Sequence, residues 1–115
     1  MKKIILIACL AVLFLFIGCM NYTPLTDEQM SFAGEWVSSD AQYLKIHANG
    51  SGGYEGYLPN SFGSLEINGG TVDITSDKIS ITFASFGREF VITKPPFEED
   101  GKMKMVLDGI TFTKK

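Results

Sequence analysis

The side chains that could carry out chemistry are few in this chain. Its 115 residues include one histidine, two cysteines, and 13 aspartates and glutamates. His47 falls on the opposite face of an expected strand from Leu44 and Ile46, so we expect it to point to solvent. No spacing typical of a Ser/His/Asp triad surrounds it, and one histidine is too few for a zinc or copper site. We therefore expect no enzymatic activity, no cofactor and no metal centre.

Two further runs are candidates for binding ions. The acidic run Glu98-Glu99-Asp100 lacks the alternating Asp and Asn ligands of a calcium loop, so we interpret it as a charged turn. The glycine-rich run 50–53 lies between expected strands and opens no helix, unlike a phosphate-binding loop. Neither run predicts a bound ion.

The distribution of charge excludes nucleic acid as a partner. Lys2 and Lys3 are the only charged residues before Asp27, and the rest of the chain carries eight basic against 13 acidic residues. Proteins that bind nucleic acid neutralise phosphates with clustered Lys and Arg, and this chain has no such cluster. With 45% hydrophobic residues, the chain is also too apolar for a disordered acidic segment.

The N-terminus is typical of an export signal. Lys2 and Lys3 precede an apolar run of 14 residues, 4–17, which is shorter than the roughly 20 residues that span a bilayer. The run ends in Phe16-Ile17-Gly18-Cys19, which resembles the lipobox of bacterial lipoproteins, although Phe16 replaces the usual leucine. The resemblance implies that residues 1–18 are removed as a signal peptide and that Cys19 is acylated. A plain secreted protein is the alternative.

Acylation would also account for both cysteines. Cys9 would leave with the signal peptide and Cys19 would carry the lipid, so no disulfide could form. Met20 stands where lipoproteins retained in the inner membrane of enteric bacteria carry aspartate, so the resemblance implies the outer membrane of a Gram-negative host. Residues 19–31 would then be a tether with a short helical turn, which Thr26 and Gln29 are suited to begin.

From Gly34 onward, apolar and polar residues alternate with period two, which is typical of antiparallel strands that cover a core on one side. Asn49-Gly50, Asn68-Gly69 and Asp108-Gly109 separate alternating runs and predict tight turns, while Pro95-Pro96 predicts the end of a strand. Residues 32–115 therefore predict one all-β domain of about nine strands, at 34–38, 42–48, 52–58, 64–68, 71–75, 78–83, 88–94, 102–107 and 110–114.

One tripeptide suggests how these strands close. Gly34-Glu35-Trp36 on the first strand resembles the opening of lipocalin-like (calycin) barrels. The resemblance implies a small up-and-down antiparallel barrel in which Trp36 seals the closed end beneath a cation, for which Arg88 and Lys114 are the candidates. A β-sandwich is the alternative. Strands about 20 Å long would leave a barrel filled by its own side chains, without a deep chamber.

The stretch 48–57 is the most distinctive in composition. Its four glycines leave backbone accessible, and its tyrosines are of a type enriched at interfaces. It faintly resembles the Ser-Gly-x-x-Tyr loop of periplasmic lipoprotein lysozyme inhibitors, although it is one residue shorter. An ordinary hairpin turn is the alternative. The candidate recognition residues are Asn49, Ser51, Tyr54 and Tyr57.

These features together indicate a lipid-anchored lipoprotein of the cell envelope. We expect its β domain to be a non-enzymatic binding or interaction module, with an envelope protein or a small hydrophobic ligand as the candidate partners. The alternatives are a lipocalin-like carrier of a small hydrophobic ligand and an inhibitor of an envelope hydrolase such as lysozyme.

Overall fold

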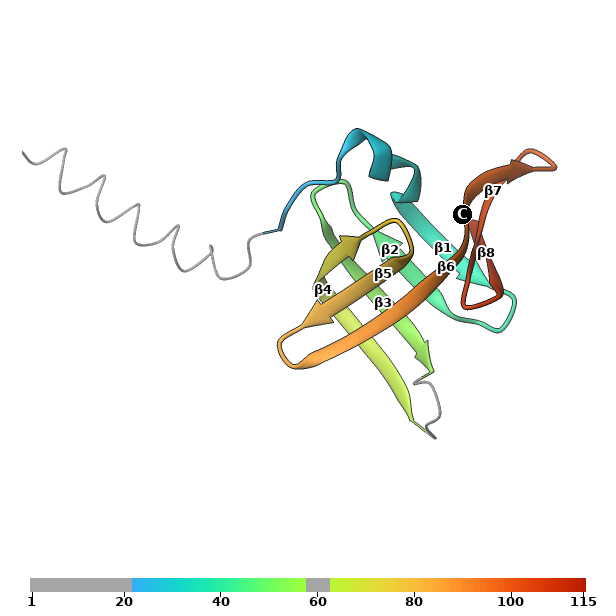
Figure 1. Cartoon of the computed structure of the whole chain (residues 1–115). Coiled ribbons are helices and arrows are strands. Elements are labelled where there is room, and N and C mark those ends of the chain that lie inside the picture. Colours follow the sequence, from blue (N-terminus) through green and yellow to red (C-terminus); the bar gives the residue numbers. More distant parts are fainter. Residues whose placement is uncertain (1–21, 58–62) are drawn as a thin grey trace, which may run out of the picture.

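Eight antiparallel strands form one closed barrel in which each strand pairs with its neighbours in sequence and β8 pairs with β1 (Figure 1). The computed structural model describes residues 22–57 and 63–115. The expected all-β up-and-down barrel is confirmed, and the sandwich alternative is wrong. The elements are η1, a 3-10 helix (Asp27–Phe32), β1 (Gly34–Ser38), β2 (Tyr43–Ile46), β3 (Ser51–Tyr57), β4 (Ser64–Ile74), β5 (Lys78–Phe83), β6 (Phe86–Glu99), β7 (Lys102–Leu107) and β8 (Ile110–Lys114).

The predicted signal peptide and the lipobox with Cys19 lie outside the described residues. Within the part of the chain that the structure describes, no helix is both long enough and apolar enough to cross a membrane.

The period-two alternation directs one face of each strand into the barrel. Edge-to-face contacts join Tyr54 to Phe90 and Phe90 to Phe112, with ring centroids 5.5 and 5.9 Å apart. The interior is filled by buried apolar side chains of every strand and of η1, namely Phe32, Trp36, Leu44, Ile46, Tyr54, Ile67, Val72, Ile74, Ile79, Ile81, Phe90, Met105, Leu107 and Phe112.

The expected turn at Asn68-Gly69 is wrong. Gly52 pairs with Gly70 and Tyr54 with Ile67, so Asn68 and Gly69 together lie opposite the single residue Gly53. This two-against-one register is a β-bulge, and Gly69 adopts the positive φ (+69°) that also made the dipeptide a turn candidate. The predicted strands 64–68 and 71–75 are therefore the single strand β4, and the barrel has eight strands rather than nine.

The expected strand end at Pro95-Pro96 is also wrong. β6 runs on to Glu99, and its register with β7 shifts between Lys94 and Phe97. The two prolines lie within this irregularity. Because the strand pairing is interrupted there, their lack of an N–H group breaks no hydrogen bond of the ladder. β6 can therefore pair with β5 through its first half and with β7 through its second half.

The alternating strand directions collect the connections at two ends of the barrel. At the end that we call the closed end, η1 packs over the strands: Phe32 is buried, and Gln29 Nε2 donates to the Ile74 carbonyl oxygen at 2.8 Å. The turn that contains Asn49-Gly50 lies at this end. The end that we call the open end carries the turns after β1, β5 and β7, and the last of these is the expected Asp108-Gly109 turn, with φ of +52° and +75°.

Candidate functional site

Trp36 lies at the closed end and is fully buried. Its indole Nε1 donates to the Phe32 carbonyl oxygen at 2.9 Å, and Lys114 Nζ lies 5.0 Å from its ring centroid. A Cβ at Gly34 would lie 2.8 Å from Lys114 Cε, so the glycine leaves room for the lysine stem to cross to the ring. These residues join η1, β1 and β8 into one plug, which is a structural role.

Arg88 lies elsewhere and does not cover Trp36. Its guanidinium carbon is 4.0 Å from the Phe90 ring centroid, and Nη1 lies 3.4 Å from Asp108 Oδ2. Asp108 Oδ1 in turn accepts from the Val91 N–H at 2.8 Å. Of the two cations expected over Trp36, Lys114 is the one that the structure places there. β7 pairs with β6 only from Ile92 onward. Arg88 and Asp108 instead cover the corresponding edge of the first half of β6.

The four residues of the predicted recognition loop are not brought together, so the prediction of one loop is wrong. Ser51 is buried at the closed end, where its N–H donates to Asn49 Oδ1 at 2.9 Å. Tyr54 is buried in the core, and its hydroxyl donates to Gln42 Oε1 at 2.8 Å. Tyr57 is 60% exposed near the open end. The physical reason is that residues 51–57 form strand β3, which spreads these side chains along the barrel. His47 is exposed, as expected.

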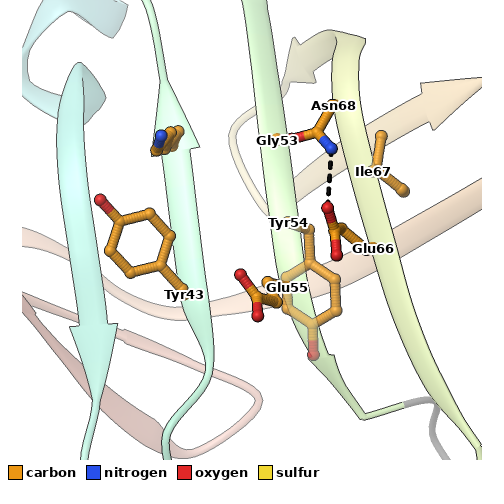
Figure 2. A pocket seen from close by; sticks show the side chains of 8 residues that line it. Tyr43, Gly53, Tyr54, Glu55, Glu66, Ile67 and Asn68 are labelled. Atoms are coloured by element: carbon orange, nitrogen blue, oxygen red, sulfur yellow. Dashed lines mark hydrogen bonds between the residues drawn. The ribbon is translucent and has the colours of Figure 1, made fainter.

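A hollow on the outer face of β2, β3 and β4 is a candidate binding site (Figure 2). Gly53 has no side chain to fill it, and a Cβ there would lie 2.7 Å from the Ile67 carbonyl oxygen. The hollow has a volume of about 60 Å³ and is lined by Tyr43, Lys45, Gly53, Tyr54, Glu55, Glu66, Ile67 and Asn68.

A second hollow continues this one toward the open end. It has a volume of about 220 Å³, shares Glu55 and Glu66 with the first, and is also lined by the exposed Tyr57. We refer to the outward side chains of both hollows as the β2–β4 face, which comprises Tyr43, Lys45, Glu55, Tyr57, Glu66 and Asn68.

Two carboxylates stand directly opposite each other on the β2–β4 face. Glu55 on β3 is the cross-strand partner of Glu66 on β4, and both are exposed. Asn68 Nδ2 donates to Glu66 Oε1 at 2.8 Å, a bond that Figure 2 shows as a dashed line. Like charges in directly opposed positions destabilise a sheet, so a cationic group bound here would relieve a cost that the fold carries.

Tyr43 on β2 borders the hollow, and its ring leans toward β1 (Figure 2). Its hydroxyl donates to the Glu35 carboxylate, which lowers the pKa of Glu35 and raises that of Tyr43. Lys45 Nζ and Lys115 Nζ lie 5.4 and 5.3 Å from the Tyr43 ring centroid. These contacts hold the ring over β1 and β2, on the side of the hollow away from the acidic pair.

A polar network lies at the open end, where no site was expected. Ser38 Oγ donates to the Asp40 carboxylate and accepts from the Gln42 N–H at 2.9 Å. Gln42 Nε2 donates to both Asp40 oxygens at 3.1 Å. The Ser38 hydrogen bond is the main reason that the pKa of Asp40 lies below its ordinary value. The network caps the barrel above Tyr54 and leaves Asp40 bonded to its own turn.

Among the described residues, no group of three or more His, Cys, Asp and Glu side chains could hold a metal ion. Comparison of the chain with protein-family models, with curated proteins and with solved structures finds no match. The functional proposal therefore depends on the residues themselves.

The β2–β4 face could not be predicted from the sequence, for a physical reason. Its residues lie on three strands, and each strand alone looks like an ordinary outward-facing alternation. The signal within reach was Gly53, because a glycine in a strand often marks a bulge or a close backbone approach.

Proposed function

We propose that this protein is a lipid-anchored, non-enzymatic binding module of the cell envelope, and that it binds a protein partner on the β2–β4 face. The observation that carries the proposal is the exposed, directly opposed pair Glu55 and Glu66 beside the hollow at Gly53. The pair lowers the stability of the sheet and contributes nothing to the core, and a cationic partner would turn this cost into binding energy.

The filled interior weighs against a carrier of a hydrophobic ligand. Aromatic side chains of β1, β3, β6 and β8 occupy the barrel axis, where such a ligand would have to lie. Support for the inhibitor alternative is also weak, because Ser51 and Tyr54 of the Ser-Gly-x-x-Tyr-like stretch are buried. The placement of Trp36 beneath Lys114 supports the likeness to lipocalin barrels.

The described part of the tether favours one orientation on a membrane. Tyr22 donates from its hydroxyl to the Gly69 carbonyl oxygen at 2.7 Å, and the Leu25 N–H donates to the Ala48 carbonyl oxygen at 2.9 Å. With two residues between Cys19 and Tyr22, an acylated Cys19 could stand at most about 11 Å from Tyr22. Acylation would therefore hold the closed end toward the membrane and present the open end to partners.

Photocrosslinking in cells tests the proposal. A photoreactive amino acid replaces Tyr57, which is 60% exposed beside the second hollow, and in a matched strain it replaces Met30, which is 42% exposed on η1. We expect one discrete protein adduct from position 57 that is absent from position 30. Adducts of the same pattern from both positions, or none from position 57, would contradict the proposal.

A further inference from the structure

β4 is longer than the strand that pairs with it on one side. β3 pairs with β4 from Ser64 to Thr71, whereas β5 pairs with it only from Thr71 to Ile74. Within residues 22–57 and 63–115, no strand pairs with residues 64–69 on the side away from β3. We call this side the open β4 edge, and at 3.3 Å per residue it is about 20 Å long.

The tip of the β5–β6 hairpin adjoins the open β4 edge. Thr82 is the last residue of β5 that pairs with β4, and Phe83 follows it. Phe83 pairs with Phe86 across the turn of the hairpin, and in Figure 1 this hairpin diverges from the first half of β4. The two strands therefore part at Phe83, and toward the open end no described strand pairs with β4 on that side.

The inward side of this region is apolar. Phe83 has the same strand parity as the fully buried Ile79 and Ile81, yet it is 43% exposed, and its partner Phe86 is 62% exposed. On β4, Leu65 is half-buried against the core. Side chains that face inward but remain exposed are what an additional strand in this position would cover.

The outward side is acidic. Glu66 lies in the middle of the open β4 edge, with Glu55 opposite it on β3. A strand added beside β4 would place its own outward side chains next to Glu66. A lysine or arginine there would be attracted by both carboxylates, and an acidic residue would be repelled.

Side chains of the protein cover another strand edge, on the first half of β6. In the first half of β6, Arg88 Nη1 donates to the Glu89 carbonyl oxygen, and Asp108 Oδ1 accepts from the Val91 N–H. Side chains thus form hydrogen bonds with backbone groups in the first half of β6, where β7 does not pair with the strand. Proteins commonly protect sheet edges in this way. Within the described residues, the open β4 edge receives one such hydrogen bond, from the Tyr22 hydroxyl to the Gly69 carbonyl oxygen, and none along residues 64–68.

We propose that the open β4 edge binds an extended segment of a partner protein as an added strand, in which basic outward residues alternate with apolar inward residues. The inference rests on the proposed function, because Glu55 and Glu66 belong to the β2–β4 face. Backbone hydrogen bonds supply affinity in such strand addition, and alternate side chains supply specificity. A second copy of this chain fits poorly, since pairing this edge with itself would bring two Glu66 side chains together.

Synthetic peptides test this inference on the full-length lipidated protein in detergent micelles. The probe is a nine-residue peptide of alternating lysine and valine. One control has the same sequence with an N-methyl group on every second residue, which removes backbone donors and keeps the charge. The other control alternates glutamate and valine. We expect the probe to bind at least tenfold more tightly than either control, and to slow hydrogen exchange of the amides of residues 64–69.

A pair of variants separates local from general electrostatics. Glu66→Lys should weaken binding of the lysine–valine peptide at least tenfold. Glu98→Lys, which changes the net charge equally at an exposed site on the second half of β6, should change it less than twofold.

Several results would overturn the inference. Equal binding of the N-methylated peptide would show that charge alone attracts the probe. Slowed exchange at β6 instead of residues 64–69 would place the peptide on another edge, and protection of residues 64–69 together with dimer formation in the absence of peptide would make a second copy the occupant. A partner captured from position 57 together with no binding of the probe would overturn strand addition and leave the proposed function standing.

Discussion

The two ends of the barrel differ in how they are closed. At the closed end, η1 covers the strands, Trp36 is fully buried, and Lys114 lies across its ring. At the open end, the hairpins diverge, and Tyr57, Phe83 and Phe86 are all more than 40% exposed. We expect the stability of the barrel to depend mainly on the closed end, since the open end leaves apolar and unpaired groups exposed.

Replacement of the cysteine that would anchor the closed end should have an all-or-none effect. Cys19→Ala should leave an unprocessed precursor without lipid. The other cysteine, Cys9, lies inside the predicted signal peptide and so cannot take the place of Cys19 as the acylated residue. Metabolic labelling with an alkyne fatty acid and membrane fractionation measure the result. A variant that is still cut at the same place and still sediments with membranes would disprove lipidation at this position.

Truncation of the plug should be the most destabilising single change in the barrel. Trp36→Ala removes a fully buried ring and its bond to Phe32, and we expect a loss of about 3–5 kcal/mol of unfolding free energy. Urea unfolding followed by far-ultraviolet circular dichroism measures it. Phe86→Ala, at the 62% exposed open-end position, is the matched control and should change stability by about 0.5 kcal/mol or less. Similar losses at both positions would contradict the division between the ends.

Backbone geometry at the closed end should be the next most sensitive feature. Gly34 has a φ of +136°, a region that other residues rarely adopt, and a Cβ there would press on the Lys114 stem. We expect Gly34→Ala to cost about 1–3 kcal/mol in urea unfolding. Gly101→Ala, at a φ of +76° with open space around its Cβ position, should cost less, because it neither meets a neighbour nor places alanine in so restricted a backbone region.

The cation over the plug should contribute less. Lys114→Met keeps most of the stem that packs on Gly34 and Trp36 and removes the charge, and we expect a loss of about 1 kcal/mol. The same substitution at Lys102, which is exposed at the β6–β7 turn, should leave stability unchanged. Trp36 fluorescence should stay blue-shifted in the variant, because η1 still covers the ring. A red shift would show that Lys114 itself shields the ring from water.

The polar network at the open end should respond to acid. The hydrogen bond from Ser38 holds the pKa of Asp40 below its ordinary value of 3.8, so the ionised carboxylate stabilises the fold above that pH. This contribution is lost as the pH falls through the lowered pKa of the folded state. Asp40→Asn and Ser38→Ala should each flatten the decline in the urea midpoint between pH 5 and pH 3 by a small amount. An unchanged decline in both variants would exclude Asp40 as its source.

Features that depend on neighbouring residues were predictable from the sequence. Alternation defined most strands, Asp108-Gly109 defined a hairpin, and Thr26 with Gln29 defined the start of η1, where the Thr26 N–H donates to Gln29 Oε1 at 3.0 Å. Each signal lies within a few residues because the backbone conformation that it controls is local.

Features that depend on register were decided by the tertiary structure alone. Asn68-Gly69 suits a turn and a bulge equally well, and its pairing opposite Gly53 on another strand made it a bulge. Lys114 rather than Arg88 covers Trp36 because β8, which closes the barrel, pairs Lys114 with Trp36. Glu55 and Glu66 became one acidic pair in the same way. Cross-strand neighbours are set by the pairing of distant segments, and alternation within one strand carries no record of which residue will lie opposite.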